Sequence, residues 1–156
     1  IRADEVDNFF VNQLQGFADL IDDIIGTLNL VGLFISFFSL LVGGFGIANI
    51  MFVSVKERTN LIGIQKSLGA KNKFILFQFL FEAVILALIG GVIGLVLVFF
   101  VSLIASSIAG DFEFILSVKN MVIGTGVSAA IGLISGILPA VSASRLDPVE
   151  AIRTGM

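Results

Sequence analysis

The chain has 156 residues, of which 57% are hydrophobic and only 13% are charged, and its formal net charge is −3. Soluble domains are nearer about 45–50% apolar and about 25% charged, so this composition excludes an ordinary soluble domain and indicates a membrane protein. The sequence contains no cysteine and no histidine. Disulfides are therefore excluded, and both metal sites and the usual nucleophile–base pairs lack parts, so we expect neither a metal nor a catalytic residue.

The first segment, residues 1–27, repeats apolar residues at helical spacing, with acids and amides between them. This pattern predicts an amphipathic helix. No proline interrupts it before the next segment, so we expect it to continue into a membrane span as a stalk outside the membrane. The alternative is a helix lying flat in the interface, although such helices usually carry Lys and Arg. Since the chain begins at Ile1 without signal-peptide features, we expect it to be the C-terminal part of a longer protein.

Three stretches carry no charge: residues 24–55, 83–110 and 120–144. Each is longer than the roughly 20 helical residues that cross a bilayer, whereas barrel strands run only about 9–11 residues. The sequence therefore predicts an all-α membrane protein with three transmembrane helices. The predicted segments are the stalk 1–27, the spans 28–55, 74–110 and 120–145, the loops 56–73 and 111–119, and the C-terminal helix or tail 146–156.

The basic residues are unevenly distributed along the chain. Five of the nine lie in the loop 56–73, and Arg145 and Arg153 follow the third span. Because Lys and Arg resist translocation, this distribution places the loop and the C-terminus in the cytoplasm and the N-terminal segment outside.

Two features of the predicted spans concern packing. The pairs Gly90/Gly94 and Gly132/Gly136 have the four-residue spacing that lets helices approach closely in lipid. Glu82 is the one ionisable residue well inside a span, where a charge costs about 2.5–3.5 kcal/mol and usually requires a partner. We interpret Glu82 as ordering helix packing at the inner side of the membrane. The alternative, a proton relay, would need further buried acids or histidines.

The loop 56–73 contains a short amphipathic pattern. Leu61, Ile64 and Leu68 share one helical face, with Ile62 beside them and Lys66 opposite. A helix of this kind lying along the inner membrane surface can anchor in anionic headgroups, or it can dock in a groove on a cytoplasmic partner.

Local signals predict where the short helices begin and end. Gly69 is a suitable stop because it tolerates the left-handed conformation, and Asn72 is a suitable cap for the following helix. Near the C-terminus, Asp147, Pro148 and Glu150 fit the N-cap, first and third positions of a new helix of about six residues.

Two motifs of this chain resemble the FtsX/MacB-type permease family, the membrane subunits of the type VII class of ABC transporters. The first is similar to the signature ERxxxIGIxKxxGA and comprises Glu57, Arg58, Ile62, Gly63, Ile64, Lys66, Gly69 and Ala70. The second is similar to the ending PAxxAxRxDPxEAxR and includes Pro139, Arg145, Asp147, Pro148, Glu150 and Arg153. Glu82 falls where the family usually has a Glu, and the resemblance covers the chain from about residue 28 onward.

The resemblance implies four spans per protein, the first preceding a large extracytoplasmic domain, so this chain would be a C-terminal part. It implies a permease dimer, homologous or identical, in a bacterial inner membrane, bound to cytoplasmic ABC ATPases that are fused or separate. ATP and Mg would be bound by the ATPase, because this chain contains no GxxxxGK[ST] loop. Residues 56–73, with Leu61 and Leu68 on their apolar face, would form the coupling helix, and ATP-driven movement would reach the external domain through the spans and stalk.

Several functions remain open at this point. The transported substrate would be a lipoprotein, a peptide or another amphiphile, or the permease would regulate cell-wall hydrolases without transport. A secondary transporter or channel is disfavoured, because apart from Glu82 no ionisable groups lie within the spans. No nucleic-acid partner is expected.

Overall fold

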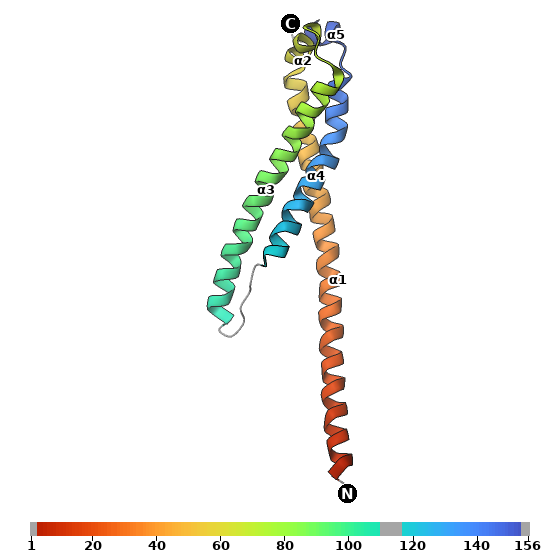
Figure 1. The fold of residues 1–156 in the computed structure, drawn as a ribbon, viewed down its shortest axis with the longest axis vertical. Coiled ribbons are helices and arrows are strands. Elements are labelled where there is room, and N and C mark those ends of the chain that lie inside the picture. Colours follow the sequence, from red (N-terminus) through yellow and green to blue (C-terminus); the bar gives the residue numbers. More distant parts are fainter. Residues whose placement is uncertain (1–2, 110–116, 154–156) are drawn as a thin grey trace. The chain divides into compact units, whose positions relative to one another are not determined.

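The computed structural model describes residues 3–109 and 117–153, and every regular element in these ranges is an α-helix. The elements, shown in Figure 1, are α1 (Ala3–Glu57), α2 (Thr59–Ser67), α3 (Asn72–Ala109), α4 (Val118–Ser144) and α5 (Pro148–Arg153). Three of these helices are long and apolar enough to cross a membrane, within Gln13–Glu57, Asn72–Ser107 and Val118–Ser144. The all-α membrane fold with three spans is therefore confirmed. Most of the predicted connection 111–119 lies outside the described residues.

The chain divides into two compact units, residues 1–41 and 42–156. The first unit consists of the N-terminal part of α1, and its helical backbone confirms the predicted helix from residue 3 onward. Large apolar side chains such as Leu14, Phe17 and Leu20 are exposed there. Whether this segment stands upright or lies flat at a membrane stays a prediction.

In the second unit, α3 and α4 pack through small residues. A Cβ placed on Gly132 would lie 2.5 Å from the Cβ of Ala87 and 3.0 Å from the carbonyl oxygen of Ala83. A Cβ on Gly136 would likewise lie 2.5 Å from the Cβ of Ala83. The two backbones are therefore closer than any side chain on these glycines would permit, and the predicted packing role of this glycine pair is confirmed.

The other predicted pair, Gly90/Gly94, behaves differently. A Cβ on either residue would meet no atom within 4 Å in the described chain. An added Cβ at either position would therefore have open space around it, although the four-residue spacing is the same. Instead, it is Gly91 that approaches α4, where its Cβ would lie 2.5 Å from the Oγ of Ser128.

The core of the second unit is concentrated at one end, where α1 and α4 finish and α3 begins. Its fully buried large side chains include Met51, Ile75 and Phe79. Further buried members of this cluster are Val55, Ile62, Ala83, Ala140 and Ala143. Figure 1 shows the two short helices, α2 and α5, at this same end, near the C-terminus. The large apolar residues farther along α3, such as Phe99 and Ile104, are exposed, as expected for a surface that faces lipid.

Candidate functional site

The short helix α2 is separated from α1 by a single residue, Arg58. The Arg58 amide still donates to the Ser54 carbonyl at 3.0 Å, whereas the Arg58 carbonyl accepts the first hydrogen bond of α2, from Ile62, also at 3.0 Å. The hydroxyl of Thr59 donates to the carbonyls of Val55 and Lys56, both at 2.9 Å. These bonds satisfy carbonyl groups that the end of α1 would otherwise leave without a partner.

At its other end, α2 terminates as the sequence predicts. Gly69 has φ +98°, the left-handed region that glycine tolerates. The Gly69 amide donates to the Lys66 carbonyl and the Ala70 amide to the Gln65 carbonyl, both at 3.0 Å. This pair of bonds is the Schellman motif, which confirms Gly69 as the helix stop.

The predicted cap of α3 is off by one residue. The amides of Phe74 and Ile75 donate to the Lys71 carbonyl, at 2.9 Å and 3.4 Å. Since the N-cap carbonyl accepts the first helical bond, Lys71 is the N-cap and Asn72 is the first helical residue. Asn72 has a side chain suited to an N-cap, but α3 begins one residue earlier than predicted, so Asn72 already lies inside the helix.

The two faces of α2 have different environments. Leu61, Ile64 and Leu68 are exposed, with 58%, 43% and 84% of their surface accessible, and we call these three residues the apolar ridge. In contrast, Ile62, which sequence reasoning placed beside this face, is only 2% exposed and belongs to the core, and its neighbour Gly63 is also buried. Ile62 and Gly63 therefore hold the helix in place, and the ridge is what the helix presents outward.

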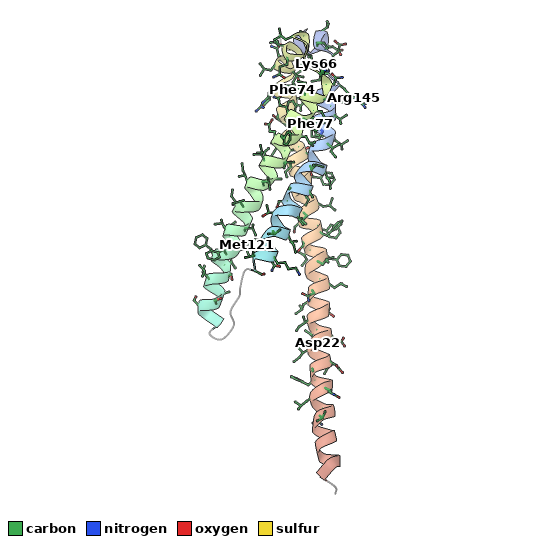
Figure 2. All side chains as sticks on the ribbon, viewed as in Figure 1. Asp22, Lys66, Phe74, Phe77, Met121 and Arg145 are labelled. Carbon is green, nitrogen blue, oxygen red and sulfur yellow. The ribbon has the colours of Figure 1, made fainter. Side chains whose placement is uncertain are left out.

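Lys66 connects α2 to the end of α4. Its side chain is half-buried, and its Nζ donates to the carbonyl oxygens of Ser144 at 2.8 Å and Leu146 at 2.7 Å. These carbonyls lie at the C-terminal end of α4, where Arg145 is the C-cap. Figure 2 shows Lys66 and Arg145 at the same end of the unit, with Met121 toward the other. A cation at this position is favourable, because a helix C-terminus carries partial negative charge.

Arg58 connects the start of α2 to α3. Its Nη1 lies 3.3 Å from the Oε2 of Glu82, and the two side chains are 48% and 29% exposed. The sequence predicts that Glu82 needs a partner for its charge, but it does not indicate which residue that partner is. Within the described chain, the Glu82 carboxylate faces the Arg58 guanidinium, and its role in ordering helix packing stays a prediction.

The C-terminal motif builds the end of α4 and the start of α5. The Oδ1 of Asp147 accepts a hydrogen bond from the Val149 amide at 2.9 Å, and α5 begins at Pro148, so the predicted N-cap and first position are confirmed. Pro139 is buried within α4, and Arg145 is exposed at its end. The remaining predicted positions are Glu57 and Glu150, which are exposed, Ala70, which packs against the core, and Arg153, whose side chain lies outside the described part of the chain.

A family model and several known proteins are similar to most of this chain. The family model described as FtsX-like permease C-terminal matches residues 33–148. The macrolide export ATP-binding/permease protein MacB of Shewanella sp. (strain W3-18-1) is 39% identical over 147 residues, covering 94% of this chain and 23% of the relative. The MacB proteins of Agrobacterium fabrum and Neisseria gonorrhoeae are 39% identical over 145 residues and 38% identical over 146 residues. They match 93% and 94% of this chain, which spans only 22% and 23% of their length. The chain therefore belongs to the FtsX-like permease family, whose C-terminal part it matches.

Proposed function

We propose that this chain is the C-terminal membrane part of an ABC-transporter permease in a bacterial inner membrane, and that α2 couples it to a cytoplasmic ATPase. The relatives are named as ATP-binding/permease proteins, and the match covers 93–94% of this chain. The chain corresponds to only 22–23% of their length, and we propose that ATP and Mg are bound by another segment or subunit. A second permease copy and an external domain complete the proposed assembly.

The observation that carries this proposal is the apolar ridge on a helix that is otherwise fixed in the fold. Leu61, Ile64 and Leu68 are exposed, while the opposite side of α2 packs against the core. An amphipathic helix presenting residues at i, i+3 and i+7 is the form that docks into an apolar groove on a partner. The neighbouring basic residues favour a cytoplasmic position, where an ATPase would be available.

The packing of α2 against the core suggests how force would be transmitted from α2 to the long helices. Ile62 belongs to the same cluster as Met51 of α1, Phe79 of α3 and Ala140 of α4. Since packed cores have low compressibility, force applied to α2 would reach the ends of all three long helices. We propose that ATP-driven movement is passed in this way to the spans, the stalk and the external domain, moving a lipoprotein, a peptide or another amphiphile.

The experiment is an Ile64→Asp substitution in the full-length permease, co-expressed with its ATPase. We expect the permease to insert normally but to lose ATPase co-purification and stimulated ATP turnover, because a carboxylate replaces an apolar contact at the centre of the ridge. The matched control is Asn72→Asp, which adds the same charge at an exposed position outside α2. Gly63→Asp is unsuitable, since Gly63 is buried and the change would test folding instead. Unchanged co-purification and turnover in Ile64→Asp would refute the docking assignment.

A further inference from the structure

The two cationic side chains of the α2 segment that contact other elements reach different long helices. Arg58, immediately before α2, pairs with Glu82 on α3 at 3.3 Å. Lys66, in the last turn of α2, donates to the carbonyls of Ser144 and Leu146 at the end of α4. The two contacts therefore tie opposite ends of α2 to different neighbours.

A helix as short as α2 needs such contacts to hold its orientation. It has nine residues, so it is about 13 Å long, and isolated helices below about 12–15 residues are marginally stable. Its side chain in the core is Ile62, near the middle, which acts as a pivot, and α5 also packs against α2. Arg58 lies four residues before Ile62 and Lys66 four residues after it, and contacts at these two places oppose rotation about that pivot.

The two contacts differ in character. Lys66 is half-buried and makes two short bonds to main-chain oxygens at a helix C-terminus, which is a favourable place for a cation. The Arg58–Glu82 pair is longer and more exposed, and such pairs contribute less. We expect the link to α4 to be the stiffer one.

We infer that Arg58 and Lys66 are positioning residues that divide the force transmitted by α2 between two helices. Arg58 passes this force to α3 through Glu82, and Lys66 passes it to α4. This inference rests on the proposed coupling function. It has a specific consequence, because removing one link should loosen the helix that this link reaches and leave the other helix held as before.

The test uses the full-length permease with its ATPase in lipid nanodiscs, carrying spin labels on introduced cysteines. The label positions are Asn60 on α2, Phe77 on α3 and Ser142 on α4, all of them exposed. The link variants are Glu82→Met and Lys66→Met, which remove the acceptor and the donor respectively. The matched control is Lys73→Met, because Lys73 is exposed and its ammonium makes no ion pair or hydrogen bond with another described residue.

We expect Glu82→Met to broaden the α2–α3 distance distribution only. Lys66→Met should broaden the α2–α4 distribution only, and Lys73→Met should change neither. Basal ATP turnover and ATPase co-purification should persist in both link variants, while stimulated turnover falls about 2- to 30-fold, the range typical for residues that carry coupling. Lys66→Arg, which keeps a cation in place, should recover part of the loss.

Three results would overturn the inference. If either variant broadened both distance distributions, the cause would be a general loss of packing. If neither distance distribution changed, the two contacts would not fix the orientation of α2. If the broadening were selective but ATP turnover were still fully stimulated, the two contacts would not transmit force. The proposed function fails in a different way. If the wild-type permease neither binds nor stimulates an ATPase, coupling is refuted even where the distances change selectively.

Discussion

The contact between α3 and α4 makes Gly132→Ala an informative substitution. The added methyl would lie 2.5 Å from the Cβ of Ala87, 3.0 Å from the carbonyl oxygen of Ala83 and 3.1 Å from the Cα of Val84. Two of these three atoms belong to the backbone, so no side-chain rotation can relieve the contact. The helices must separate, and separation opens the neighbouring contact at Gly136.

The size of the effect follows from two opposing terms. Overpacking of a tight core typically costs about 1–3 kcal/mol. Replacing glycine by alanine inside a helix gains about 0.8–1.0 kcal/mol of intrinsic propensity, which reduces the observed loss. Gly126→Ala provides the matched control, because Gly126 lies on the same helix and its Cβ would meet nothing within 4 Å. The propensity gain is common to both variants, so the difference between them isolates the steric cost.

The measurement is the free energy of unfolding of the full-length permease by denaturing detergent titration in mixed micelles. We expect Gly132→Ala to be less stable than Gly126→Ala by about 1–3 kcal/mol. A difference below about 0.5 kcal/mol, the usual spread for surface substitutions, would show that α3 and α4 do not approach as closely as the structure has them.

Two further predictions concern the short helices. Asp147→Ala removes the acceptor of the Val149 amide and should cost about 0.5–2 kcal/mol of local stability, seen as faster hydrogen exchange in α5, whereas Asp147→Asn should retain the cap. Equal exchange in the two variants would contradict this assignment. Gly69→Ala forces a side chain into φ +98° and should lower the melting temperature through a cost of about 1–2 kcal/mol, and Gly69→Asn should be milder because asparagine tolerates this region better. If alanine and asparagine proved equivalent, the strained backbone would not be the cause.

The helices and their ends were predictable because their causes are local. Each apolar run is longer than a bilayer crossing, which is why it predicts a helix. The helices α3 and α4 begin only two residues before the predicted starts of their spans. The stop at Gly69 and the start at Pro148 follow from backbone preferences of single residues. The misplaced cap at Asn72 shows the limit of such signals, since a suitable side chain does not decide where a turn closes.

The contacts between elements were not predictable in the same way. Lys66 and the carbonyls that it binds are 78 and 80 positions apart, and Arg58 and Glu82 are 24 apart. Periodicity showed that α2 has distinct faces but not which of them is buried, because apolar residues occur on both sides. That choice depends on the neighbouring helices, and it placed Ile62 in the core and left Leu61 outside.

The first motif of this chain, which resembles the signature ERxxxIGIxKxxGA, has a physical explanation in this arrangement. Three of its residues contact other elements, namely Arg58, Ile62 and Lys66, and Gly69 ends the helix. Together these residues fix the position of α2 in the fold. On the apolar ridge, only Ile64 belongs to the signature, while Leu61 and Leu68 occupy its unspecified positions. Most residues of the motif therefore fix α2 in the fold, and few of them lie on its exposed apolar ridge. A match to the motif therefore predicts a helix fixed in the fold. In the proposed coupling function, the choice of ATPase would depend largely on the ridge residues that the motif leaves free.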